Sequence, residues 1–230
     1  MRDFPTSPEA FDACLFDMDG LLLDTERMFM RSFVALTSDL DIAPSEAEAF
    51  FITLVGTSAA ETTRRLGAFL PSGVDIAGFD LVWRENHAAN AAQGIALKPY
   101  VLEVLSALHV RNIPMAVVTS TAGCFARKHL KHAGLLRFFD AVCAGDEVRA
   151  NKPHPEPYLT GAALLGVDAA RCVAFEDSDL GTRAAIAAGC ATFQIPDLRP
   201  TEVPVPDIGQ KVVTHLGEAA RHIGVLEEGF

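Results

Sequence analysis

Short apolar runs alternate with helical patterns along most of the chain. The first run, residues 14–16, lacks a polar face, which is typical of a strand buried on both sides of a parallel sheet. The predicted strands are residues 14–16, 115–118, 141–144, 172–175 and 191–194, with 212–213 as a candidate sixth strand at the edge. The predicted helices between them are residues 100–109, 124–133, 155–165, 180–188 and 216–223. This alternation favours an α/β fold, a Rossmann-like parallel sheet with helices on both faces.

A block of purely helical spacing interrupts this alternation after the first strand. Its predicted helices start at Thr25, Pro44, Ser58 and about Ala77. We therefore expect an α/β core of residues 1–22 and 97–230, with a small helical cap of residues 23–96 inserted into it. An insertion at this point lies above the carboxyl edge of the sheet, where a lid can exclude water and select substrates.

Composition narrows the class of partner. The 230 residues are 50% hydrophobic, enough for a sizeable core, and carry a net charge of −11. A chain without a basic surplus cannot release counterions from a nucleic-acid backbone, so we expect no nucleic-acid partner. A small anionic substrate is compatible with this charge, because it responds to the local site and its metal.

The cysteines and the apolar runs indicate the compartment. The five cysteines form no CxxC pair and no metal spacing, which fits reduced, mostly buried thiols. Met1 leads into charged residues and prolines rather than an apolar segment, so no secretory signal is expected. No apolar run reaches the ~20 residues that span a bilayer. We expect a cytoplasmic protein with no membrane partner, and a monomer rather than an oligomer.

Two acids, Asp17 and Asp19, directly follow the first predicted strand and precede Gly20. Open α/β sheets place their ligands at the carboxyl ends of the strands. Two acids one residue apart at such a place can both be steered towards one small site. One can then act as nucleophile or metal ligand while the other manages protons. Asp-Gly is also a common turn pair, so this interpretation depends on partners elsewhere in the chain.

Candidate partners follow three further predicted strands. Thr119, Ser120 and Thr121 follow the second strand, where hydroxyls at a helix start suit a phosphate or simply cap the helix. Thr119 and Ser120 are the candidates for the phosphate. Lys152 follows the third strand, and the neighbouring Pro153 and Pro155 restrict the backbone around it, which is unusual for a disposable surface charge. Glu176 and Asp177 follow the fourth strand and can bind a hard cation or cap the next helix.

Together these groups predict phosphoryl transfer on a small phosphorylated metabolite. A carboxylate would attack phosphorus, while Mg²⁺ and a lysine neutralise the phosphoryl oxygens and hydroxyl donors orient them. A metal also relieves the repulsion between acids crowded into one site.

The ordered set resembles the haloacid dehalogenase superfamily over nearly the whole chain. The matching stretches are FDMDG at 16–20, VVTS at 117–120, NKPHPEPY at 151–158 and FEDSDLGTRAAIAAG at 175–189. The inserted helices resemble the small helical cap of the family's first type.

The resemblance implies a role for each candidate. Asp17 would be the nucleophile that forms an aspartyl-phosphate, and Asp19 the general acid and then the general base. Thr119 and Lys152 would hold the phosphate. The implied Mg²⁺ ligands are Asp17, the backbone carbonyl of Asp19 and Asp177, with Glu176 nearby.

The resemblance also separates the reactions within the family. Dehalogenating members lack an aspartate at the position of Asp19, and phosphonate-cleaving members carry a cap lysine, whereas residues 23–96 contain none. Sugar-phosphate phosphatases and β-phosphoglucomutase are the most similar groups. The mutase has a histidine at the position of Phe29 and an arginine where this chain offers Thr57 to Ala59. We therefore predict a phosphatase acting on a sugar phosphate or a phosphoglycolate-like ester, with the mutase as the alternative.

A non-enzymatic alternative is a phospho-acceptor signalling module, which also combines aspartates, a hydroxyl and a lysine on a parallel sheet. The long helical insertion argues against it, since such a module needs no cap. Substrate choice is assigned to cap residues. The candidates are Gly56, Thr57 and Arg27, with Arg84 and His87 as weaker ones.

Overall fold

The protein is described by a computed structural model that covers residues 4–55, 59–199 and 202–227. The chain divides into two compact units. Unit 1 comprises Met1–Asp24, Ala96–Asp197 and Val205–Phe230, and unit 2 comprises Thr25–Ile95 and Leu198–Pro204. Each unit has its own core, so each is described separately below.

Unit 1 is built on a six-stranded parallel sheet. Its strands, in spatial order, are β3 (Ala141–Cys143), β2 (Met115–Val118), β1 (Ala13–Phe16), β4 (Cys172–Glu176), β5 (Ala191–Gln194) and β6 (Lys211–Val212). In the centre, Phe16 pairs with Val117 of β2 on one side and with Phe175 of β4 on the other. The chain runs outwards from β1 in both directions, so the strand order reverses between β1 and β4. Such a switch point is where open α/β sheets bind ligands.

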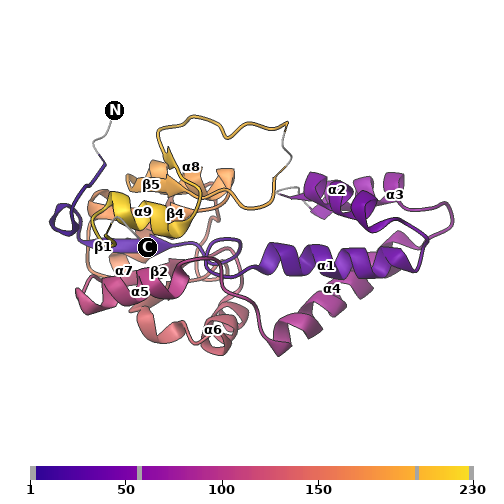
Figure 1. The fold of residues 1–230 in the computed structure, drawn as a ribbon, viewed down its shortest axis with the longest axis horizontal. Coiled ribbons are helices and arrows are strands. Elements are labelled where there is room, and N and C mark those ends of the chain that lie inside the picture. The colour runs from indigo at the N-terminus through magenta and orange to yellow at the C-terminus, as the bar shows by residue number, and fades with distance from the viewer. Residues whose placement is uncertain (1–3, 56–58, 200–201, 228–230) are drawn as a thin grey trace. The chain divides into compact units, whose positions relative to one another are not determined.

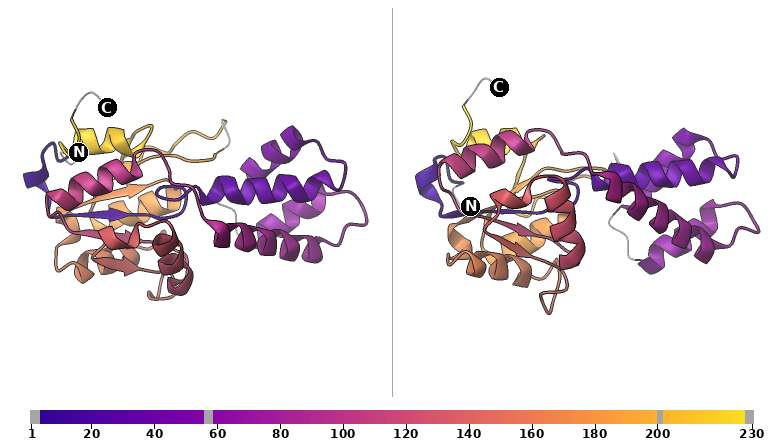
Figure 2. Two further views of the ribbon diagram at one scale, coloured as in Figure 1. Left: turned by 60° about the horizontal axis from the view of Figure 1, so that its bottom comes forward. Right: turned by 90° about the horizontal axis from the view of Figure 1, so that it is seen from below.

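Helices cover both faces of this sheet, as Figures 1 and 2 show. They are α5 (Val101–Val110), α6 (Gly123–His132), α7 (Glu156–Leu164), α8 (Asp179–Ala188) and α9 (Leu216–His222). Helices α5 and α9 lie against one face, and α7 and α8 lie against the other. Alternate residues of β1 serve the two layers, and Leu15 packs with Tyr158 and Ala184 in the cluster beneath α7 and α8. The predicted Rossmann-like α/β fold is confirmed.

Small departures from the predicted elements have local causes. Strand β4 extends one residue beyond the predicted 172–175, because Glu176 pairs with Gln194 of β5. Its carboxylate is fully buried and accepts hydrogen bonds from protein donors, so the acid can remain in the ladder. Three short 3₁₀ helices went unpredicted, since three residues show no periodicity. They are Pro8–Ala10, Leu136–Phe138 and Ala169–Arg171.

The described residues of unit 2 form a helical array around an aromatic core. Its helices are α1 (Thr25–Ser38), α2 (Pro44–Leu54), α3 (Ala59–Phe69) and α4 (Ile76–Gln93). Trp83 is almost fully buried, stacks on Phe29 at 4.0 Å between ring centroids, and donates its indole N–H to the Phe29 carbonyl at 3.0 Å. The predicted helices are confirmed, while the cap residue Ser58 lies outside the described residues.

The chain segments that lead to and from unit 2 are tied together within unit 1. Residues on either side of the insertion form an antiparallel bridge between Leu23 and Leu97. The Asp24 amide donates to the Ala96 carbonyl at 2.9 Å. Lys98 adds ionic contacts, with its Nζ 2.6 Å from Asp197 Oδ1 and 3.4 Å from Asp24 Oδ1. Lys98 therefore bridges Asp24 and Asp197, the residues at which the chain leaves unit 1 for the first and for the second time.

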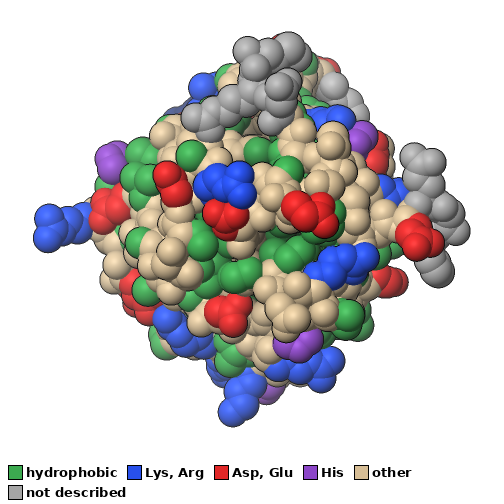
Figure 3. Space-filling view, turned by 90° about the vertical axis from the view of Figure 1, so that its left-hand side faces the viewer, with side chains coloured by type: hydrophobic (Ala, Val, Ile, Leu, Met, Phe, Trp, Pro, Cys, Tyr) green, Lys and Arg blue, Asp and Glu red, His purple; other side chains and the backbone are tan. Residues whose placement is uncertain are grey.

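The free, mostly buried thiols agree with the prediction made from the cysteine pattern. On the face in Figure 3, acidic and basic side chains are interspersed among apolar ones. All five cysteines are free, and only Cys124 is exposed. Among the residues that the structure describes, no helix has the length and hydrophobicity needed to cross a membrane.

Candidate active site

The predicted functional residues of unit 1 come from neighbouring strand ends. Asp17 directly follows β1, and its amide donates to the Phe175 carbonyl of β4 at 3.0 Å. Thr119 directly follows β2, and its amide donates to the Cys143 carbonyl of β3 at 3.0 Å. Parallel pairing therefore continues just past each strand and brings these side chains to one edge of the sheet. The edge is the carboxyl edge, at the switch point beside β1.

Lys152 is an interior residue of this site. Its Nζ lies 2.5 Å from Asp17 Oδ1, 2.6 Å from Glu176 Oε1 and 2.9 Å from the Val118 carbonyl. Only 6% of the Lys152 side chain is exposed. Burial opposes its charged form, but the Asp17 and Glu176 carboxylates outweigh burial and raise the pKa of Lys152. The ammonium therefore stays charged and is fixed in direction.

Asp17 lies in a crowded acidic environment. Burial raises the pKa of Asp17 to about 8, Lys152 opposes this increase, and the neighbouring Glu176 and Asp19 carboxylates add to it. A fully ionised cluster at this edge thus needs more positive charge than one lysine supplies.

Asp19 is held by hydroxyl groups. Thr121 Oγ1 donates to Asp19 Oδ2 at 2.7 Å, and Thr119 Oγ1 lies 3.4 Å from the same oxygen. The Thr121 amide in turn donates to Thr119 Oγ1 at 3.0 Å. Thr121 belongs to the predicted run of hydroxyls, but only Thr119 and Ser120 were assigned to the phosphate. Ser120 is exposed, and in the described part of the chain no contact links its side chain to the carboxylates.

Asp17, Glu176 and Asp177 form a group with the geometry of a cation site. One carboxylate oxygen from each lies within 4.8 Å of the others. Oxygen ligands at such spacing suit a hard divalent cation. Gly20 makes room for this group, because a Cβ at Gly20 would collide with Asp177 Oδ2. Gly20 also has a φ of +82°, which residues with a side chain rarely adopt. The donor set therefore fits the predicted metal.

Glu176 is also bound on both of its oxygens by protein donors. Its Oε1 accepts from the Tyr158 hydroxyl at 2.6 Å as well as from Lys152. Its Oε2 accepts from the Ser178 hydroxyl at 3.0 Å and the Ser178 amide at 3.3 Å. Tyr158 was not among the predicted site residues, although a buried tyrosine usually directs its hydroxyl to a polar partner.

The predicted specificity residues fall in unit 2. Gly56 and Thr57 lie outside the described residues. Arg27 is exposed on α1. Arg84 pairs with Asp80 at 2.8 Å, and His87 contacts Phe29 edge to face. Their role in substrate choice stays a prediction.

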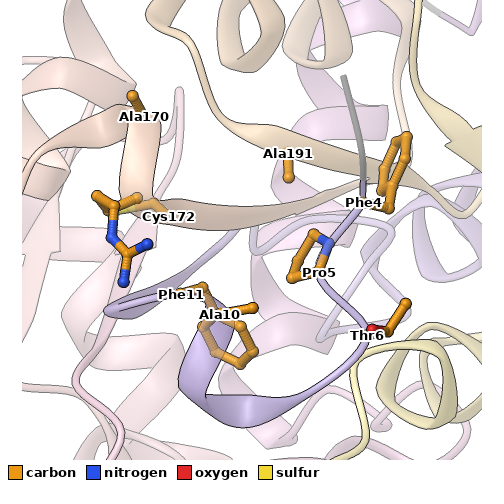
Figure 4. A pocket seen from close by; sticks show the side chains of 9 residues that line it. Phe4, Pro5, Thr6, Ala10, Phe11, Ala170, Cys172 and Ala191 are labelled. Atoms are coloured by element: carbon orange, nitrogen blue, oxygen red, sulfur yellow. The ribbon is translucent and has the colours of Figure 1, made fainter. Parts of the chain in front are cut away.

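A separate hollow lies at the opposite edge of the sheet, where β4 and β5 begin (Figure 4). Arg171 at its margin is already paired with Asp12 at 2.7 Å. The lining residues are Phe4, Pro5, Thr6, Ala10, Phe11, Ala170, Arg171, Cys172 and Ala191. These residues are mostly apolar and include none of the carboxylates described above.

The fold and the site define a Rossmann-like enzyme whose polar groups are carboxylates and a buried lysine at the switch point of the sheet. Residues 14–195 match the haloacid dehalogenase-like hydrolase family, and the chain belongs to that family.

Named relatives and a solved structure narrow this assignment. The chain is 31% identical to the fructose-1-phosphate phosphatase YqaB of Escherichia coli, over 79% of this chain and 94% of that protein. It is 34% identical to hexitol phosphatase A of E. coli, over 79% of this chain and 81% of that protein. A hydrolase structure from Deinococcus radiodurans, with bound phosphate and sodium, has a TM-score of 0.76 and 25% identity, covering 96% of this chain and 99% of that one. These similarities support a phosphomonoester hydrolase.

Proposed function

We propose that the protein is a Mg²⁺-dependent phosphatase that hydrolyses a small phosphate monoester, namely a sugar phosphate or a phosphoglycolate-like ester. The observation that carries this proposal is the convergence of Asp17, Asp19, Lys152 and Asp177 at one edge of the sheet. Relatives named as sugar-phosphate phosphatases support the choice of substrate class.

Each residue has a role in this proposal. Asp17 attacks phosphorus and forms an aspartyl-phosphate, and the Lys152 ammonium offsets charge on the phosphoryl oxygens. Asp19, held by Thr121, protonates the leaving oxygen and then takes a proton from the attacking water. Thr119, with its hydroxyl next to Asp19, helps orient the phosphoryl group.

The metal site would involve the acids nearest Asp17. Asp17, the Asp19 carbonyl and Asp177 would hold Mg²⁺, with Glu176 nearby. When bound, the ion supplies positive charge to the phosphoryl oxygens and lowers repulsion between the carboxylates.

Hydrolysis is favoured over mutase chemistry by the surroundings of Phe29. A mutase must protect its aspartyl-phosphate from water until a sugar intermediate is aligned for a second transfer. The Phe29 ring stacks on Trp83 and contacts Phe51 and His87, so it is part of the aromatic core of unit 2. An apolar side chain in this position offers no hydrogen bond to control the timing of Asp19.

Residues 23–96 would act as a cap that selects the leaving group. The insertion begins a few residues after Asp19, so the chain itself links the site to the helices of unit 2. Arg27, Gly56 and Thr57 remain the candidates for contact with the sugar or acid part of the substrate.

The test is a panel of phosphate monoesters assayed with Mg²⁺, including fructose 1-phosphate, hexitol phosphates, glucose 1-phosphate, phosphoglycolate and p-nitrophenyl phosphate. We expect hydrolysis of at least one sugar phosphate, its loss with EDTA and its return with Mg²⁺. The Asp17→Asn variant is the matched control and should be inactive while folded. No hydrolysis across the panel, or full activity without metal, would contradict the proposal.

A further inference from the structure

The carboxylate of Glu176 is the most constrained charged group of the site. It is fully buried, yet it accepts four hydrogen bonds from Lys152, Tyr158 and the amide and hydroxyl of Ser178. Tyr158 and Lys152 share one oxygen, each at 2.6 Å. Because the lysine contacts Asp17 with the same ammonium, the direction of the Glu176 carboxylate fixes where the positive charge lies.

Tyr158 enters this arrangement from α7, which lies against one face of the sheet. Its side chain is fully buried, and its ring centroid lies 5.3 Å from Lys152 Nζ. The ring therefore contributes packing and a cation–π contact, which a phenylalanine would retain. The hydroxyl contributes something separate, a hydrogen bond to a buried charged acceptor, and such bonds are among the strongest in proteins.

Gly181 on α8 also borders the Glu176 carboxylate. A Cβ on Gly181 would collide with both oxygens of Glu176. Gly181 lies on α8 and does not have a positive φ, so the backbone does not require glycine there. The missing side chain instead provides the space that the carboxylate occupies.

We propose that Tyr158 is a positioning residue for the phosphatase reaction. Its hydroxyl, together with the space left by Gly181, holds Glu176 so that Lys152 is directed at Asp17. Without the hydroxyl, Oε1 of Glu176 keeps only the lysine, and the carboxylate is held by Ser178 at its other oxygen alone. The carboxylate is then less firmly fixed, and so is the ammonium that it directs at Asp17. This inference rests on the proposed function, since it assigns Lys152 to the phosphoryl group.

The main test is Tyr158→Phe, with Tyr100→Phe as the matched control. Tyr100 is the only other tyrosine of the chain, and its ring stacks on His215 at 4.4 Å between centroids. Two quantities are measured: kcat/KM for the best monoester of the panel, and the Kd of inorganic phosphate by calorimetry with Mg²⁺ present. For Tyr158→Phe we expect kcat/KM to fall by about tenfold, equivalent to about 1.4 kcal/mol. The phosphate Kd should rise in parallel, and Tyr100→Phe should change neither quantity more than about twofold.

Two further variants separate positioning from a general loss of stability. Gly181→Ala disturbs the same carboxylate through a different contact and should also weaken phosphate binding. In a Glu176→Gln background, Tyr158→Phe should change the phosphate Kd by less than about twofold, because its effect passes through Glu176. An unchanged Kd in Tyr158→Phe, or a tenfold change that persists in the Glu176→Gln background, would overturn the inference. A wild-type protein that hydrolyses no monoester would overturn the proposed function and this inference with it. An active wild type whose phosphate Kd is unchanged by Tyr158→Phe would overturn this inference alone, so the two failures are distinguishable.

Discussion

Adding one methyl group at Gly20 should weaken metal binding far more than it destabilises the fold. Gly20 has a φ of +82°, and forcing a residue with a side chain into the left-handed region costs about 1–2 kcal/mol. A Cβ there would also lie 2.9 Å from Asp177 Cγ and closer still to Oδ2. Non-bonded carbon atoms prefer separations of about 3.5–4.0 Å, so the Asp177 carboxylate has to move by about 0.5 Å or more.

A shift of that size exceeds what a metal site tolerates, since its groups must be held within about 0.5 Å. Disturbing the surroundings of metal ligands typically weakens metal affinity by about 10- to 100-fold. We therefore expect Gly20→Ala to raise the Mg²⁺ concentration for half-maximal activity by about that factor. The midpoint temperature of thermal unfolding should fall only by the amount that the backbone strain at Gly20 explains, about 2–4 °C per kcal/mol for a chain of this size.

Gly166→Ala supplies the matched control. Gly166 also has a positive φ, +73°, but a Cβ there would meet nothing within 4 Å. It should show the same loss of thermal stability with an unchanged Mg²⁺ requirement. The reasoning is refuted if Gly20→Ala keeps the wild-type Mg²⁺ dependence, or if Gly166→Ala raises it equally.

Three further outcomes follow from the same structure. Asp19→Asn should retain the fold and most of the metal affinity, because only the backbone carbonyl of residue 19 is assigned to the metal. It should lower kcat by about 10²–10⁴-fold. A kcat within a few-fold of wild type would leave Asp19 without a proton-transfer role. With β-glucose 1-phosphate and a trace of glucose 1,6-bisphosphate, phosphate should appear in step with substrate loss, whereas glucose 6-phosphate without phosphate release would favour the mutase. Trp83→Ala should destabilise unit 2 by about 3–5 kcal/mol, because it empties the centre of the aromatic core. Circular dichroism during thermal unfolding measures this loss, and a change below about 1 kcal/mol would contradict the packing described here.

The sheet was predictable because its strands are buried on both faces. Residues 115–118 are apolar without interruption, and the bounds predicted for 115–118 and 191–194 agree with β2 and β5. Parallel strands also end at the same edge, so the proximity of Asp17, Thr119 and Asp177 followed from topology alone. The sequence pattern thus predicted which residues follow the strands at this edge of the sheet.

Other features depend on contacts that no local pattern encodes. The hydrogen bond of Tyr158 to Glu176 joins residues 18 positions apart, and that of Thr121 to Asp19 joins residues 102 positions apart. The extension of β4 through Glu176 depends on donors from Tyr158 on α7 and from Lys152 in the segment before it. The residues that choose the substrate were the hardest to predict. Arg27 and His87 lie on helices with many other polar side chains, and nothing in the sequence distinguishes a polar residue that contacts substrate from one that faces solvent.

The bridge between Leu23 and Leu97 also bears on how this chain could be rebuilt. An antiparallel pair with the Asp24 amide bonded to the Ala96 carbonyl has the geometry of a hairpin base, which a two-residue turn can close. The 71 positions of Thr25–Ile95 therefore leave and re-enter unit 1 at one narrow stem, while Leu198–Pro204 joins unit 2 separately. In engineering terms a different helical segment could be grafted at this stem without changing the register of any strand, provided that it also covers Leu198, which packs against the core of unit 2.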